Sequence, residues 1–109
     1  MASFELSPEE IRSAGEQLPQ QVRDDIAFCQ ANVRAFAEAQ LASLRPLEVE
    51  LRPGVTLGHR LLPVRSVGCY VPGGLYPMPG SAAMSILPAK VAGVASIVAC
   101  TPPVKGKGL

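Results

Sequence analysis

The sequence predicts an α/β fold in which N-terminal helices and a β-ribbon precede one βαβ unit of a parallel sheet. Three observations lead to this fold class. Apolar residues recur at helical spacing between residues 19 and 41, which indicates an amphipathic helix. Two short alternating segments then flank an Arg-Pro-Gly turn signal. Finally, residues 67–100 read as strand, glycine-proline loop, helix and strand.

Composition limits the chain to one small domain or part of one, since it has 109 residues of which 48% are hydrophobic. A formal net charge of +1 provides no long-range field for gathering nucleic acid or an anionic membrane surface. Every acidic side chain lies at or before Glu50. Residues 66–109 therefore offer no side-chain carboxylate for base catalysis or metal binding.

The three cysteines are an odd number without a Cys-x-x-Cys pair, a pattern that favours a reduced, cytoplasmic location. The first residues, Met-Ala-Ser-Phe-Glu, lack the basic and apolar regions of a signal peptide. Proline and glycine interrupt the weakly charged region from 66 to 104, so we expect no membrane span.

The first predicted helix begins after Ser7, which can act as the N-cap, with Pro8 at the first helical position and Glu10 completing a capping box. This helix fades between Gly15 and Pro19. A second helix from about Pro19 to about Leu41 carries one mostly apolar stripe that seeks a partner surface: Val22, Ile26, Cys29, Val33, Phe36 and Gln40.

The next predicted element is a β-ribbon. Leu47–Leu51 alternates apolar and polar residues as a half-exposed strand does, and Arg52-Pro53-Gly54 forms the turn. Val55–Leu62 returns as the second strand, and Pro63 ends it. We therefore divide the chain into a helical segment at 1–46, the ribbon at 47–66 and the βαβ unit at 67–109.

The βαβ unit is predicted from a strand at Val67–Val71, a loop at Pro72–Gly80, a helix capped by Ser81 that ends near Gly93, and a strand at Ile97–Cys100. Pro88 lies inside the helix, where it removes one hydrogen bond and should kink it. From residue 66 to residue 104 the only charge is Lys90. We therefore expect both strands and the helix to be buried on more than one side, which requires more strands than these two and indicates a piece of a larger protein.

The loop that follows the first βαβ strand, Tyr70-Val-Pro-Gly-Gly74, has the most specific chemical character in the chain. A backbone with few side chains at the end of a strand permits close approach of a flat or anionic ligand. The spacing differs from the Gly-x-Gly-x-x-Gly dinucleotide fingerprint, and the second strand is not followed by a carboxylate. A tight structural turn and a cofactor-binding edge both remain open, and Tyr70 serves equally as a core residue or a ligand contact.

Other reactive side chains favour structural interpretations. His59 is the only histidine and is predicted to face solvent on a strand. Cys69 and Cys100 are expected to be small buried thiols near the ends of the two strands, without a neighbouring cation to activate them. Lys90 is expected to reach solvent from its helix. The residues therefore predict no catalytic group and no metal ligand set in this chain.

Taken together, four strings at these spacings resemble the histidinol dehydrogenase family: Gly68-Cys-Tyr70-Val-Pro-Gly-Gly74, then Met84, then Pro88-Ala-Lys-Val-Ala-Gly93, then Cys100-Thr-Pro-Pro103. The resemblance spans almost the whole chain but covers only part of the family's usual length. It implies a cytoplasmic homodimer that oxidises an alcohol to a carboxylate through an aldehyde, using NAD and zinc. It also implies incomplete Rossmann-like units without the dinucleotide fingerprint.

Within the resemblance, Tyr70 matches the family tyrosine that contacts NAD, and Pro72 and Gly73 match the adjoining loop. The zinc ligands and catalytic bases of the family have no counterpart here. Since a zinc site needs three or four ligands and His59 could be only one, the 109 residues alone are expected to be inactive. Their open apolar surfaces predict self-association or aggregation.

The substrate implied by the resemblance is histidinol or, as the alternative, a small diol. Leu75-Tyr76 after the double glycine, Gly80-Ser81 before the helix, and Cys69 resemble relatives that oxidise other diols, including sulfopropanediol. A non-enzymatic binding or assembly module that reuses the βαβ unit is the competing class. A coding continuation beyond Leu109 that holds a Gln-x-x-His pair and a Glu-His pair would favour the enzyme.

Overall fold

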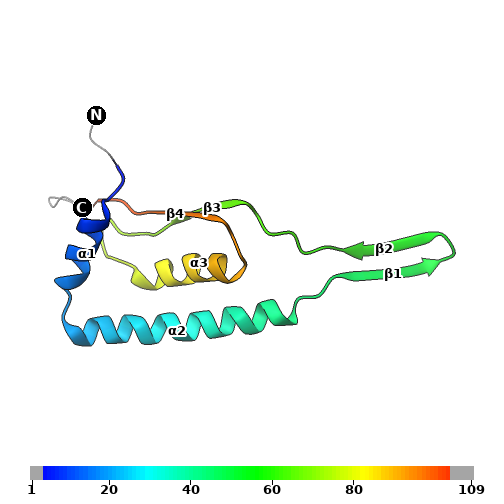
Figure 1. Ribbon diagram of the computed structural model, residues 1–109, viewed down its shortest axis with the longest axis horizontal. Coiled ribbons are helices and arrows are strands. Elements are labelled where there is room, and N and C mark those ends of the chain that lie inside the picture. The colour runs from blue at the N-terminus through cyan, green and yellow to red at the C-terminus, as the bar shows by residue number, and fades with distance from the viewer. Residues whose placement is uncertain (1–3, 104–109) are drawn as a thin grey trace.

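The computed structural model describes residues 4–103 and confirms a mixed α/β fold with three helices, one antiparallel hairpin and one two-stranded parallel sheet (Figure 1). The elements follow in this order: α1 (Pro8–Glu16), α2 (Gln20–Ser43), β1 (Leu47–Arg52), β2 (Val55–His59), β3 (Ser66–Tyr70), α3 (Pro79–Val91) and β4 (Ser96–Cys100). The predicted order of elements is confirmed.

The start of α1 is fixed by the capping box that the sequence predicts. The backbone N–H of Glu10 donates to Ser7 Oγ at 3.2 Å, and the Ser7 N–H donates to Glu10 Oε2 at 2.7 Å. The Ser7 backbone N–H, and after it the Ser7 side-chain hydroxyl, lower the pKa of the Glu10 carboxyl, because hydrogen bonds to the carboxylate favour its ionised form. Helix α2 begins directly after Pro19 and continues to Ser43, slightly beyond the predicted end.

The ribbon is an antiparallel hairpin in which Leu47 pairs with His59 and Val49 with Leu57. A bulge between Glu50 and Arg52 leads into the turn, where Gly54 has a φ of 79° and donates its N–H to Glu50 Oε1 at 2.7 Å. The prediction that the second strand reaches Leu62 is wrong, since β2 ends at His59. The position opposite Arg60 would be Pro46, which has no N–H to continue the ladder.

Strands β3 and β4 pair in parallel, with Val67 beside Ile97 and Cys69 beside Ala99, and α3 connects them. This confirms the βαβ unit, although both strands begin one residue earlier than predicted and β3 ends at Tyr70. The prediction that Ser81 caps the helix is wrong. Helix α3 begins at Pro79, whose fixed φ suits the first helical turn, and the Ser81 carbonyl accepts a bond from Ser85 Oγ at 2.8 Å.

Helix α3 lies between α2 and one face of the β3–β4 sheet (Figure 1). The buried apolar residues come one from each layer: Ala37 of α2, Leu87 of α3 and Cys69 of β3. The opposite face of the sheet is open, with Tyr70 63% and Val98 64% exposed. The expectation that these elements are buried on more than one side is therefore wrong for this structure, because no element among the described residues covers that face.

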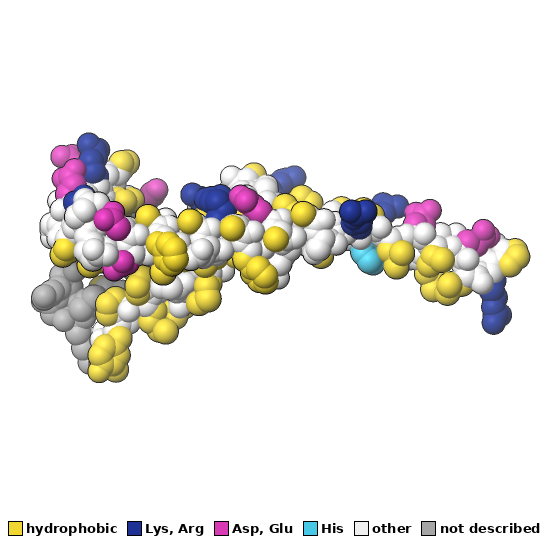
Figure 2. Space-filling model, turned by 90° about the horizontal axis from the view of Figure 1, so that it is seen from below, with side chains coloured by type: hydrophobic (Ala, Val, Ile, Leu, Met, Phe, Trp, Pro, Cys, Tyr) yellow, Lys and Arg dark blue, Asp and Glu magenta, His cyan; other side chains and the backbone are white. Residues whose placement is uncertain are grey.

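The molecule is elongated, with a radius of gyration of 19.1 Å against about 13 Å for a compact domain of this length. The β1–β2 hairpin projects from the helical body, and hydrophobic side chains lie exposed along both the body and this arm (Figures 1 and 2). In residues 4–103, each helix is too short or too polar to span a lipid bilayer. The apolar surface expected from the sequence is thus present and uncovered.

Candidate functional site

The candidate site is the edge of the parallel sheet where β3 and β4 both end. Tyr70 and Cys100 are paired in the last position of the ladder, and the Val71 N–H donates to the Cys100 carbonyl at 2.8 Å. This bond keeps the segments that leave the two strands side by side. In open α/β sheets, the carboxyl ends of parallel strands are where ligands bind.

Tyr70 places an open aromatic ring at this edge. Its side chain is on the sheet face opposite α3, and the residue is 63% exposed. Pro72 and Gly73 follow it and are half-buried. The three residues predicted from the sequence to contact a cofactor therefore lie together at one edge, and the Tyr70 ring has a free surface on which a flat ligand can stack.

The glycine loop after β3 rests on the segment after β4. A Cβ atom at Gly73 would lie 2.8 Å from Thr101 Oγ1 and 3.6 Å from Pro102 Cδ. Gly74 has a φ of 36° and faces the Pro102 ring, with 3.8 Å between an added Cβ and Pro102 Cγ. Both positions thus favour glycine, but for different reasons. At Gly73 a side chain would meet Thr101, whereas at Gly74 the positive φ is unfavourable for other residues.

Sequence reasoning missed Thr101 and Pro102 as parts of this edge. It looked after the second strand only for a carboxylate that could bind a ribose. The available signal was positional: residues that directly follow two neighbouring parallel strands emerge at the same edge. Because Tyr70 and Cys100 are paired, Thr101 had to lie near the glycine loop.

The chemistry of this edge suits recognition of a neutral, flat group and close approach of backbone to ligand. Its residues from Tyr70 to Gly74 and from Cys100 to Pro103 include no Asp, Glu, Lys, Arg or His. It therefore contains no carboxylate, imidazole or amine for proton transfer. An exposed aromatic ring beside a half-buried Pro-Gly backbone fits one side of a dinucleotide site, in which the ring stacks on a base or nicotinamide.

A zinc site is not assembled by this part of the chain. Within residues 4–103, His, Cys, Asp and Glu side chains form no group of three that could hold a metal ion. Zinc requires at least three protein ligands together, so the described residues do not fit this metal.

Most of the remaining sequence candidates lie in positions that match their structural interpretations, but the expectation that Cys100 is buried is wrong, because no described element covers its face of the sheet. His59 is exposed on the hairpin, with its Nε2 2.9 Å from the Arg45 carbonyl oxygen. Cys69 is 4% exposed in the core, whereas Cys100 and Lys90 are exposed. Figure 1 shows the hairpin and the carboxyl ends of β3 and β4 at opposite ends of the long axis. His59 is therefore remote from Tyr70.

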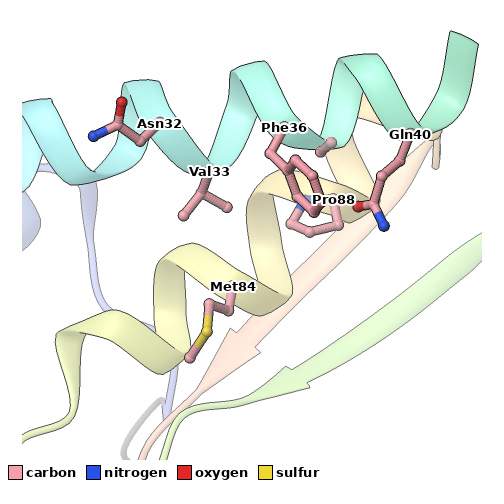
Figure 3. A pocket seen from close by; sticks show the side chains of 7 residues that line it. Asn32, Val33, Phe36, Gln40, Met84 and Pro88 are labelled. Atoms are coloured by element: carbon pink, nitrogen blue, oxygen red, sulfur yellow. The ribbon is translucent and has the colours of Figure 1, made fainter.

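A second surface feature is an apolar groove of about 400 Å³ between α2 and α3 (Figure 3). Val33 and Phe36 point from α2 toward α3, and Phe36 remains 67% exposed. The groove lacks titratable side chains and is lined by the following residues: Asn32, Val33, Phe36, Ala37, Gln40, Met84 and Pro88. Its composition is that of a packing surface.

Comparison with known proteins gives a consistent set of matches. A family model described as histidinol dehydrogenase matches residues 1–108. The histidinol dehydrogenase homolog of Shouchella clausii is 57% identical over 104 residues, which are 95% of this chain and 24% of that protein. The sulfopropanediol 3-dehydrogenase of Ruegeria pomeroyi is 49% identical over 107 residues, which are 98% of this chain and 25% of that protein.

The histidinol dehydrogenase of Methanosarcina barkeri is 41% identical over 103 residues, covering 94% of this chain and 24% of that protein. A crystal structure of histidinol dehydrogenase from Elizabethkingia anophelis superposes with a TM-score of 0.81 at 26% identity, covering 100% of this chain and 25% of that chain. The chain thus spans about a quarter of the length of the curated relatives that it matches.

Proposed function

The chain belongs to the histidinol dehydrogenase family, and from this premise we propose that it supplies one wall of the NAD site of a zinc-dependent alcohol dehydrogenase. The observation that carries the proposal is the exposed Tyr70 ring at the shared carboxyl edge of β3 and β4. This edge is where parallel sheets bind nucleotides.

In this proposal each residue of the edge has one task. The Tyr70 ring stacks on a flat ring of the dinucleotide, and Pro72 and Gly73 let the cofactor approach the backbone closely. When bound, NAD accepts the hydride that the alcohol loses. The segments around Tyr70, which lack Asp, Glu, Lys, Arg and His, favour binding of an uncharged planar group.

The proton-handling groups and the zinc ligands belong, in this proposal, to other parts of the intact enzyme. The 109 residues bind part of the cofactor but do not oxidise an alcohol by themselves. Residues 67–109 are the first βαβ unit of an incomplete Rossmann-like domain, residues 1–46 its helical cover and residues 47–66 a ribbon. The intact enzyme is proposed to be a cytoplasmic homodimer.

The proposed substrate is a small alcohol, either histidinol or a diol. Identity to the sulfopropanediol 3-dehydrogenase is 49%, against 41% to the histidinol dehydrogenase of M. barkeri. Leu75-Tyr76 directly after the glycine pair and Gly80-Ser81 at the start of α3 also favour the diol alternative. These differences support a substrate other than histidinol.

A chimeric enzyme tests the proposed function. Residues 1–108 of this chain would replace the matching quarter of the R. pomeroyi sulfopropanediol 3-dehydrogenase, and NADH formation would be followed with sulfopropanediol and with histidinol. The proposal expects a folded chimera that reduces NAD with one of the two alcohols. The 109-residue chain alone serves as the control and is expected to form no NADH.

Two results would contradict the proposal. A folded chimera that turns over neither alcohol would show that this chain cannot serve as the nucleotide wall. Dehydrogenase turnover by the isolated chain would show that the proton-handling groups are present in it.

A further inference from the structure

Thr101 lies against Gly73 and has no role in the function proposed above. Gly73 does not adopt a positive φ, so its backbone conformation is open to any L residue. What excludes a side chain is Thr101, whose Oγ1 lies 2.8 Å from the position of a Cβ at Gly73. Gly74 differs, because its φ of 36° is itself unfavourable for other residues.

The chemistry of a threonine side chain makes this contact demanding. Its β-carbon carries an oxygen, a methyl group and a hydrogen, which exchange places among the three staggered rotamers. Only one rotamer points the hydrogen toward Gly73, so in the other two a heavy atom occupies the place that a Cβ would need. A β-branched residue at position 101 therefore fixes the distance between the glycine loop and the segment that follows β4.

Pro102 extends the same support. Its Cδ and Cγ lie 3.6 and 3.7 Å from the Cβ position at Gly73, which is ordinary van der Waals contact. The proline ring is rigid. The hydrogen bond from the Val71 N–H to the Cys100 carbonyl holds the two segments together, one residue before Thr101 and two residues before Gly73. The segment after β4 is thus a firm base for the loop after β3.

We propose that Thr101 is a positioning residue that fixes the position of the Tyr70–Gly74 loop and thereby the geometry of the nucleotide wall. The steric contact between the Thr101 side chain and Gly73 is called the seat of this loop. The proposal rests on the proposed function for the nucleotide itself, but the seat is a steric property of this chain. Thr101 acts through Gly73. Its side chain excludes a methyl group at Gly73, and Gly73 in turn brings the loop close enough to Thr101 to be supported.

This reciprocity predicts compensation between the two positions. Gly73→Ala forces Thr101 from its rotamer and weakens NAD binding about fivefold, the factor that corresponds to about 1 kcal/mol. Thr101→Ala removes the support under the loop and also weakens binding. In the double variant the new methyl group fills the space that the threonine has left, so affinity returns to within about twofold of the wild type.

The experiment measures NAD titrations of the ¹⁵N-labelled 109-residue chain through its amide chemical shifts. Thr101 and its three substitutions Thr101→Val, Thr101→Ser and Thr101→Ala are compared in the Gly73→Ala background. The number of rotamers free of a heavy-atom clash is the same for Val and Thr, higher for Ser and highest for Ala, which has no γ atom. Recovery in that order supports the seat. Recovery by Ser alone would instead indicate a hydroxyl hydrogen bond and would overturn the steric proposal.

Gly74→Ala is the matched control, since its effect arises from backbone conformation. Thr101→Ala should not restore NAD binding to it, and equal restoration of both glycine variants would overturn the proposal. The amide shifts without NAD report the loop position independently of the cofactor. A wild-type chain that binds no NAD overturns the proposed function, whereas additive effects of Gly73→Ala and Thr101→Ala on a wild-type chain that does bind overturn the seat alone.

The same variants in the R. pomeroyi chimera provide a second measurement that does not need the isolated chain to fold. There the seat predicts a raised KM for NAD with kcat nearly unchanged, and recovery of KM in the double variant. A loss of kcat at unchanged KM, without recovery, contradicts a positioning role.

Discussion

Tyr70→Ala separates binding from stability more cleanly than any other substitution at the edge. The residue is 63% exposed, so only about a third of the ring contributes to packing and its removal costs about 1 kcal/mol of folding free energy or less. Stacking of a base on an aromatic side chain is worth about 1–3 kcal/mol. We therefore expect NAD affinity to fall about tenfold or more while the thermal midpoint changes by only a few degrees.

Tyr76→Ala is the control, because it removes the same type of side chain from the segment that follows β3, at a position that is 75% exposed. It should leave NAD affinity within about twofold of the wild type, since Tyr76 lies beyond the end of the β3 ladder. Both variants would be titrated with NAD by isothermal calorimetry, with thermal unfolding followed by circular dichroism. Equal losses of affinity in the two variants, or no loss in Tyr70→Ala, would refute the stacking role.

The sequence offers a direct optical version of this test. The chain has no tryptophan and two tyrosines. Tyr76→Phe therefore leaves Tyr70 as the only strong ultraviolet emitter, and its fluorescence should be quenched saturably by NAD after correction for absorption by the nucleotide. Quenching that is linear and unsaturable would indicate collisions in solution and not a bound complex.

Three further predictions concern the scaffold. Gly58→Ala drives a Cβ into the β1 backbone and should increase amide exchange throughout the hairpin about tenfold or more, whereas Gly80→Ala, with open space around it, should not. Leu87→Ala should cost about 2–5 kcal/mol in chemical unfolding, and exposed Met84→Ala about 1 kcal/mol or less. The lowered pKa of Glu10 stabilises α1 above its ordinary pKa of about 4.3, so α1 amide shifts should report fraying as pH falls through the lowered value, and Glu10→Gln should abolish that step.

Local signals account for the elements that were predicted well. Ser7 and Glu10 form their capping box from neighbouring residues alone, and Gly54 makes the hairpin turn through its own φ of 79°. These features depend on a few consecutive residues, so a sequence is sufficient to find them. The order of the strands and helices follows from the same kind of information.

The errors have tertiary causes. The end of β2 depends on what lies opposite it, since Pro46, directly before β1, cannot extend the ladder. Ser81 is a good capping residue by type, yet Pro79 already suits the first helical turn and α3 begins there. Burial of the β3–β4 sheet depends on elements that residues 4–103 do not provide, so an apolar sequence alone could not show that Val98 is exposed.

The sequence predicted only one of the two segments that form the candidate site. Tyr70, Pro72 and Gly73 were identified through the loop that contains them and the family resemblance. Thr101 contributes through a contact between segments far apart in the chain, and only the parallel pairing of β3 with β4 brings it under Gly73. Such a contact becomes visible when the strand register is known.

The most direct test of the nucleotide wall is a map of the amide shifts that NAD induces across the ¹⁵N-labelled chain. We expect the largest shifts on the amides of Tyr70, Val71, Gly73, Gly74 and Thr101, at the carboxyl edge of the parallel sheet. Shifts concentrated in the groove between α2 and α3, or no saturable shifts at all, would contradict it.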